Sequence, residues 1–88
     1  MKLKKDFVLR QVADTWVVLP VGQASVSFNG LMSLNGSGAL LWQTLEKGSD
    51  LQGLADALVA EYEVDRETAL ADAEEFLATV RKAGCLEG

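Results

Sequence analysis

Acidic side chains in the last third of this chain are the first candidates for chemistry. Asp72 and Glu75 stand three residues apart, so a helix would place both carboxylates on one face, with Asp65, Glu67 and Glu74 nearby. Such a pair can act as an acid and a base or bind a hard metal ion. However, the sequence contains no histidine and no calcium-loop pattern. We therefore predict a solvated helix face, with a polar contact to a bound partner as the alternative, and we expect neither a catalytic nor a metal site.

The stretch Asn35-Gly36-Ser37-Gly38 is the second candidate, because it looks superficially like a nucleophile turn or a phosphate loop. A serine nucleophile needs a base, and the chain has no histidine to supply one. A phosphate loop needs a Gly-Lys-Ser/Thr ending, which is missing here. We expect a tight turn between a strand and a helix.

The composition narrows the function classes further. The net charge of −5 argues against a nucleic-acid partner, because neutralising phosphates requires clustered Lys and Arg. The lone cysteine, Cys85, cannot form an internal disulfide and is expected to be a small packing residue. No apolar run is long enough to span a membrane and no secretory signal is recognisable, so we expect a cytoplasmic protein. The 88 residues predict a single domain, and no cofactor is expected.

The predicted secondary structure changes within residues 30–42, where a short strand leads into a helix, with β-structure before this stretch and helices after it. Residues 7–12 and 15–19 are rich in β-branched and aromatic side chains and predict a hairpin, which Pro20 ends. Residues 31–34 predict a further strand after an Asn29-Gly30 turn. Residues 24–28 form a fourth strand or an irregular segment, and this alternative stays open.

Three amphipathic helices are predicted at residues 38–47, 51–62 and 66–83. Their expected caps are Asn35 or Ser37, Ser49 or Asp50, and Asp65. The apolar faces are predicted to comprise Ala39, Leu40, Leu41, Trp42, Leu45, Leu51, Leu54, Ala55, Leu58, Val59, Tyr62, Ala69, Ala73, Phe76, Leu77 and Val80. The fold class is therefore α+β: a three- to four-stranded antiparallel sheet followed by three helices, in a winged helix-turn-helix-like arrangement.

The strand at residues 31–34 is the most promising functional feature. If it lies at the sheet edge, its unpaired backbone groups can accept an extended peptide as an added strand. Two flanks of the last helix could form the opposite wall of such a groove. One flank comprises Asp72, Phe76, Thr79 and Ala83, and the other comprises Leu70, Glu74, Leu77 and Arg81. Plain core packing is the alternative role of Phe76.

An ordered set of short segments also resembles PqqD-like proteins from about Phe7 onward. The segments are Leu31-Met32-Ser33-Leu34-Asn35, Gly38-Ala39-Leu40-Leu41-Trp42, Leu45-Glu46-Lys47-Gly48, Leu54-Ala55-Asp56-Ala57-Leu58, Glu61-Tyr62-Glu63-Val64-Asp65, Thr68-Ala69, Asp72, Glu75-Phe76-Leu77 and Gly84-Cys85-Leu86. The resemblance implies three strands, three helices and recognition of ribosomally made, post-translationally modified peptides. It further implies that a precursor's leader peptide binds as an added strand between the third strand and the third helix.

Carried onto this sequence, the resemblance implies a peptide-binding groove. Its residues are Leu31, Met32, Ser33 and Leu34, facing Asp72, Phe76, Thr79 and Ala83. The resemblance also implies delivery of the precursor to a modifying enzyme, which for PqqD itself is a radical S-adenosylmethionine (SAM) enzyme. We expect generic peptide recognition rather than pyrroloquinoline quinone (PQQ) synthesis specifically.

Two other function classes remain as alternatives. The last helix could read DNA in a winged-helix transcription factor, although its outward positions are mainly acidic. The sheet could instead dock an enzyme through exposed apolar residues such as Trp16, without binding any peptide. A monomer is expected, with a dimer paired through the strand edge as the alternative.

Overall fold

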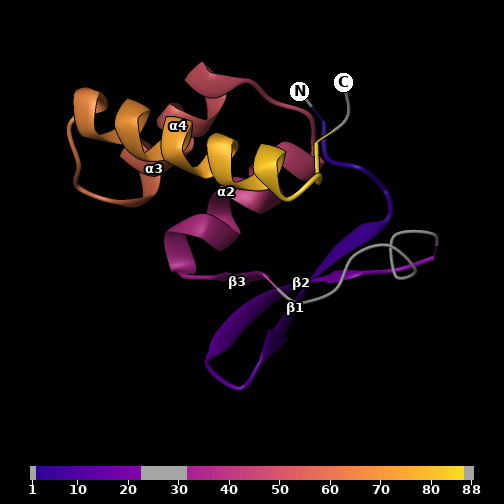
Figure 1. The fold of residues 1–88 in the computed structure, drawn as a ribbon. Coiled ribbons are helices and arrows are strands. Elements are labelled where there is room, and N and C mark those ends of the chain that lie inside the picture. Colours follow the sequence, from indigo (N-terminus) through magenta and orange to yellow (C-terminus); the bar gives the residue numbers. More distant parts are fainter. Residues whose placement is uncertain (1, 23–31, 87–88) are drawn as a thin grey trace.

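The computed structural model describes residues 2–22 and 32–86. Within them a small antiparallel sheet precedes three helices that lie together on one side of it (Figure 1). The elements are β1 (Phe7–Val12), β2 (Thr15–Pro20), β3 (Met32–Leu34), α2 (Gly36–Glu46), α3 (Leu51–Glu61) and α4 (Arg66–Lys82). The predicted order of strands and helices is confirmed.

The three strands are ordered β1-β2-β3, so the strand at the centre comes from the predicted hairpin. The tight β1–β2 turn holds Ala13 at a φ of 55°, a left-handed conformation that is uncommon for residues other than glycine. Strand β2 extends to Pro20, opposite Phe7, one residue beyond the predicted end. The proposed strand at residues 24–28 and the Asn29-Gly30 turn lie outside the described residues.

Side-chain caps set where each helix begins. The Asn35 side chain accepts a hydrogen bond from the Gly38 backbone N–H at 2.8 Å, and the Ser37 hydroxyl donates to the same Asn35 oxygen at 2.9 Å. Because Asn35 is the cap, α2 begins at Gly36, two residues earlier than predicted. Asp50 and Asp65 cap α3 and α4 in the same way.

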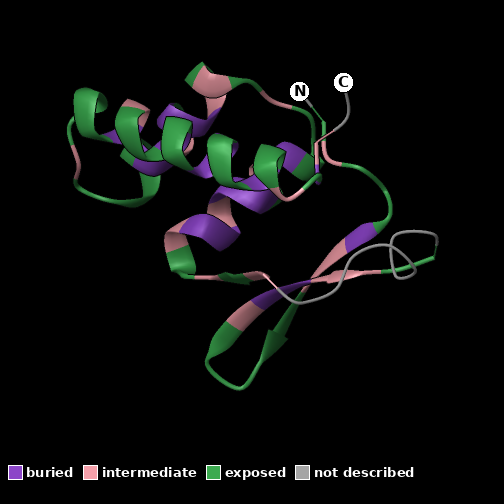
Figure 2. Ribbon diagram, in the orientation of Figure 1, coloured by how far each residue is buried: buried purple, intermediate pink, exposed green. Residues whose placement is uncertain are grey.

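The core lies between the sheet and the facing sides of the three helices (Figure 2). Its largest fully buried side chains are Trp42, Leu45, Leu54, Val18, Val80 and Cys85. Two apolar positions of α3 were predicted wrongly, since Val59 is 42% exposed and Tyr62 is 41% exposed. Val59 lies at the border of the apolar stripe, and Tyr62 leaves it because its backbone is already extended at the C-cap.

The two ends of the described chain meet beside α4. Leu3 forms an isolated antiparallel bridge with Leu86, and the Lys4 backbone N–H donates to the Cys85 carbonyl at 2.8 Å. Cys85 is completely buried, which confirms the predicted packing role. Among the helices of the described residues, none has the length and apolar character needed to cross a membrane.

Candidate functional site

A hollow of about 430 Å³ opens between β3, the first turns of α2 and one side of α4. Side chains from four elements and the connection between two of them contribute to it. The lining residues are Ser33, Leu34, Asn35, Ser37, Gly38, Leu41, Leu58, Asp72, Glu75, Phe76 and Thr79. The hollow thus combines an apolar floor with a polar rim.

The floor is made of core side chains that reach the surface on one side. Leu41 and Leu58 are each only 3% exposed, and Phe76 is 8% exposed. All three belong to the buried core cluster, and Leu34 packs against it from β3. Because the core fixes these side chains, the floor is preformed and can receive an apolar group without large rearrangement.

The rim on the α4 side is acidic. Asp72, Glu75 and Thr79 lie on one stripe of the helix, at spacings of three and four residues. The Thr79 hydroxyl donates to the Glu75 carbonyl at 3.0 Å, so its oxygen keeps only acceptor capacity toward the hollow. This acidic side of α4 gives no support to the DNA-binding alternative.

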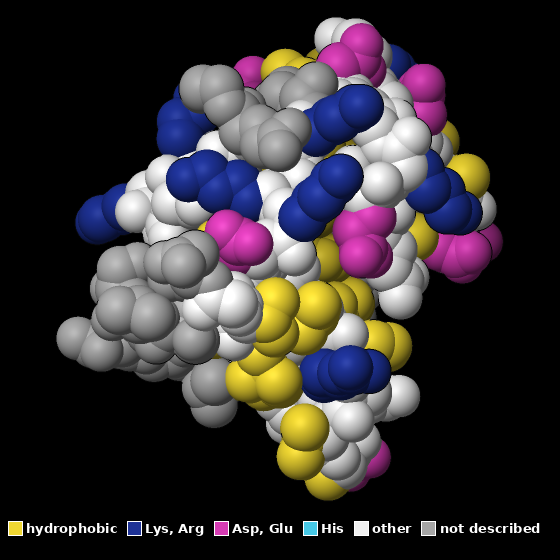
Figure 3. All heavy atoms as spheres, turned by 90° about the vertical axis from the view of Figure 1, so that its right-hand side faces the viewer, with side chains coloured by type: hydrophobic (Ala, Val, Ile, Leu, Met, Phe, Trp, Pro, Cys, Tyr) yellow, Lys and Arg dark blue, Asp and Glu magenta, His cyan; other side chains and the backbone are white. Residues whose placement is uncertain are grey.

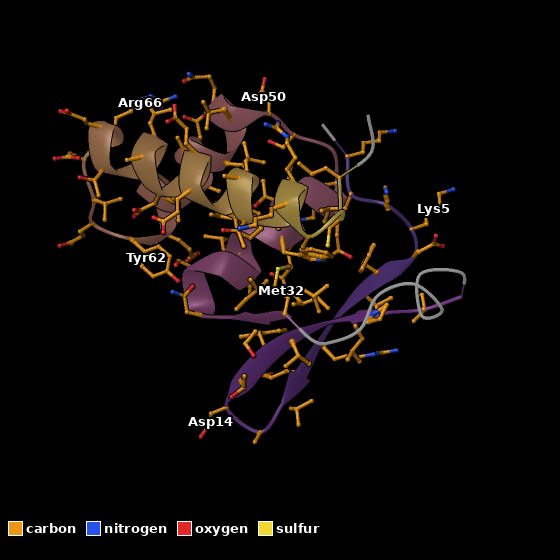
Figure 4. The ribbon with its side chains drawn as sticks, in the orientation of Figure 1. Lys5, Asp14, Met32, Asp50, Tyr62 and Arg66 are labelled. Carbon is orange, nitrogen blue, oxygen red and sulfur yellow. The ribbon has the colours of Figure 1, made fainter. Side chains whose placement is uncertain are left out.

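No described residue pairs with the two rim carboxylates. Among residues 2–22 and 32–86, neither Asp72 nor Glu75 forms an ion pair or a hydrogen bond through its side chain. The ion pair that these residues do contain joins Arg66 to Asp56, where α4 meets α3 (Figure 4). The described residues also contain no group of three or more His, Cys, Asp or Glu side chains able to hold a metal ion.

Strand β3 supplies the opposite side of the hollow. It pairs with β2 along one edge, with Ser33 opposite Val17, and no other strand within the described residues pairs with its second edge. A strand in this position presents backbone N–H and C=O groups that an extended chain can use. The hollow and this edge together make a groove with a backbone ladder on one side and side-chain contacts on the other.

The structure brings together five of the eight residues predicted for a peptide groove. Ser33, Leu34, Asp72, Phe76 and Thr79 all line the hollow. Their role in binding stays a prediction, but the shared location favours the flank of α4 that contains Asp72. No residue of the alternative flank lines the hollow, and Leu77 from that flank is buried in the core.

Two of the other three predicted residues do not line the hollow. Met32 projects from β3 toward the helices and packs against the core beside the hollow (Figure 4). Ala83 is the C-cap of α4 and also packs against the core. Leu31 lies outside the described residues.

Sequence reasoning missed the contribution of α2 and α3 to the site. Asn35 and Ser37 were identified only as caps, whereas Leu41 and Leu58 were identified only as core positions. Glu75 was predicted to lie on a solvated face, with a polar contact to a bound partner as the alternative, and it was not placed in the groove. One signal was available, since Asn35 follows the strand directly and its helix must therefore begin beside the strand edge.

The sheet provides a second surface to compare with this groove. Figure 3 shows hydrophobic side chains gathered in the lower part of the view, where the sheet lies, while most of the charged side chains in this view lie in its upper part. Val12 and Val21 are among the exposed apolar residues. Trp16, named in the enzyme-docking alternative, is only partly exposed, so it is not the exposed apolar residue that was expected. It is on the same face of β2 as the buried Val18, because strand side chains alternate.

Comparison with known proteins adds independent findings. The family model described as coenzyme PQQ synthesis protein D (PqqD) matches residues 15–86. No significant match is found among curated proteins. A structure of TbiB1 in complex with the TbiA(beta) leader peptide is 31% identical, with a TM-score of 0.79 over 100% of this chain and 96% of that chain. Lasso peptide synthetase B1 complexed with the leader peptide is 25% identical, with a TM-score of 0.79 over 99% of this chain and 96% of that chain.

Proposed function

The chain belongs to the PqqD family, and we propose that it is a non-catalytic protein that binds the leader segment of a ribosomally made precursor peptide. The leader adds as a strand to the second edge of β3 and places side chains in the hollow beside α4. The observation that carries this proposal is the hollow itself, which lies directly beside a strand edge that no described strand occupies.

Two further observations support the proposal. The similar structures of TbiB1 and lasso peptide synthetase B1 were both solved with leader peptides bound. The preformed apolar floor matches the need of a strand-adding peptide for pockets that receive alternate side chains. Residues 1–88 act in this proposal as one peptide-recognition domain. Its groove residues are the five predicted ones that line the hollow, Ser33, Leu34, Asp72, Phe76 and Thr79, together with Glu75, Leu41 and Leu58.

The bound precursor is then presented to a modifying enzyme, of the radical SAM type or another peptide-modifying class. This chain contributes affinity and orientation, and the partner enzyme carries the reaction.

The test uses synthetic peptides covering the N-terminal segments of the small reading frames encoded beside this chain's gene. Isothermal titration calorimetry is expected to give binding by one such segment at micromolar or tighter concentration. Absence of binding by every segment at several hundred micromolar would contradict the proposal.

A second measurement tests the mode of binding. Methylating alternate backbone amides of the binding peptide removes ladder donors while leaving every side chain in place. One of the two alternate sets of methylated amides is expected to abolish binding, and the other set, which points away from β3, is expected to have little effect. Equal tolerance of both sets would show that the peptide does not add as a strand.

A further inference from the structure

We propose that the peptide segment recognised by this chain carries a Lys or Arg side chain two residues away from its apolar anchor. The cation binds Asp72 and Glu75 while the anchor enters the floor beside Phe76. This inference rests on the proposed peptide binding at β3 and adds the charge and the spacing of the residues that are recognised.

The two carboxylates are suited to a cation brought by a partner. Both line the hollow from the same side of α4 and both are exposed. No Lys or Arg is among the residues that line the hollow, and neither carboxylate has a partner within the described residues. Lys82 lies seven residues beyond Glu75 on the same stripe, which is about 10 Å along the helix axis and outside the lining. The hollow therefore has negative charge that the described residues leave uncompensated.

The spacing of the site suggests where the cation lies relative to the anchor. Alternate side chains of an added strand point to the same face and are separated by about 6.6–6.8 Å. Asp72 and Phe76 are four residues apart on α4, a step of about 6 Å along the helix axis. Strand β3 and α4 also lie along similar axes in the view of Figure 1, with their chains running in opposite directions. A strand residue whose side chain reaches Phe76 thus has its second neighbour on one side opposite Asp72, and Glu75 lies between these two positions, within reach of a long cationic side chain.

The two carboxylates also disfavour peptides with an acidic side chain at this position. An acidic side chain in the same place would face two carboxylates and lose its hydration without gaining a partner. A lysine ammonium can contact both carboxylates as a point charge, and an arginine guanidinium can bind one of them through two parallel hydrogen bonds. Both cations therefore fit the rim, and a neutral polar side chain gains less from it.

The test begins with a displayed library of random twelve-residue peptides selected on the wild-type protein. Enriched peptides are expected to contain Lys or Arg two positions from an aromatic or large aliphatic residue. The affinity of one enriched peptide is then measured for Asp72→Asn, Glu75→Gln and the matched control Glu74→Gln, which makes the same charge change outside the hollow. Each rim variant is expected to weaken binding about three- to tenfold, and the control less than twofold.

A charge exchange gives a second and independent readout. Replacing the peptide's cation with Glu is expected to weaken binding to the wild-type protein, and Asp72→Lys is expected to restore part of that loss. Thermal melting of each variant verifies that it is folded, and raising the salt concentration is expected to weaken wild-type binding more than binding to Glu75→Gln.

The outcomes separate this inference from the function on which it rests. If peptides are enriched and bind at β3 without a basic residue, or if Glu74→Gln weakens binding as much as Glu75→Gln, the inference is overturned and the proposed function stands. If no peptide is enriched and the leader segments also fail to bind, the proposed function is overturned and this inference falls with it.

Discussion

Trp16 lies directly opposite Leu34 across the β2–β3 ladder, so both side chains project from the same face of the sheet. Leu34, on the edge strand β3, lines the hollow. Trp16, on the central strand β2, is partly exposed. An added strand on the free edge of β3 would therefore lie within two strands of an indole ring. The other tryptophan, Trp42, is completely buried in the core.

Peptide binding is expected to change the fluorescence of Trp16. We expect an altered emission intensity or a blue shift in Trp42→Phe, where Trp16 is the only remaining tryptophan. The Trp42 Nε1 atom has no hydrogen-bond partner among the described residues, so this substitution removes no hydrogen bond. The converse variant, Trp16→Phe, is the control and should show little change on addition of the same peptide. A response from Trp42 alone would place the peptide away from β3.

Substitutions of Asp72 and Phe76 are expected to differ in their effects on peptide binding and on the free energy of unfolding. Phe76 is both core and floor, so Phe76→Ala should lower the free energy of unfolding by about 3–5 kcal/mol as well as weaken binding. Asp72→Ala changes an exposed rim residue and should alter stability by less than about 0.5 kcal/mol while still weakening peptide binding. Urea melts and calorimetry on both variants measure the two effects. A loss of binding in Asp72→Ala that only parallels a loss of stability would contradict the assigned rim role.

The Asp65 cap is expected to make stability depend on pH in the acid range. Hydrogen bonds from the Thr68 side chain and backbone N–H lower the pKa of Asp65 below its ordinary value of 3.8. The folded state thus favours the carboxylate, and this contribution is present above the unfolded pKa and is lost as the pH falls through the folded pKa. Melting temperatures of wild type and Asp65→Asn should therefore converge as the pH falls from 6 to about 3. A gap that stays constant over this range would contradict the cap's electrostatic contribution.

Cys85 is expected to be unreactive while the protein is folded. Burial raises the pKa of its thiol, and Lys4 opposes this effect only in part. The raised pKa leaves little thiolate at neutral pH, and the thiolate is the reactive form. Reaction with a thiol reagent should be slow in buffer and fast in concentrated urea. Equal rates in the two conditions would contradict the packing role.

The sequence predicts local structure in this chain better than it predicts the site. Helix starts follow from side chains such as Asp50 and Asp65, because a cap acts within three residues of itself. The hollow has no comparable local signal. Periodicity identified Leu41 and Leu58 as apolar positions. It cannot show where the helices that carry them separate and leave a hollow beside a strand. That space depends on how β3, α2 and α4 are arranged in three dimensions. Glu75 was therefore not predicted as a groove residue, although a polar contact to a bound partner was considered for it.

The bridge between Leu3 and Leu86 has a consequence for engineering. It brings the two ends of the described chain together, with 82 residues between the bridged positions. The points at which a host chain would connect to this domain are therefore close in space. Inserted as a cassette into an exposed loop of a host enzyme, the chain should need only short connectors. The host enzyme would then gain affinity for the leader peptide. Measuring turnover of a leader-tagged substrate by the chimera would show whether the affinity is transferred.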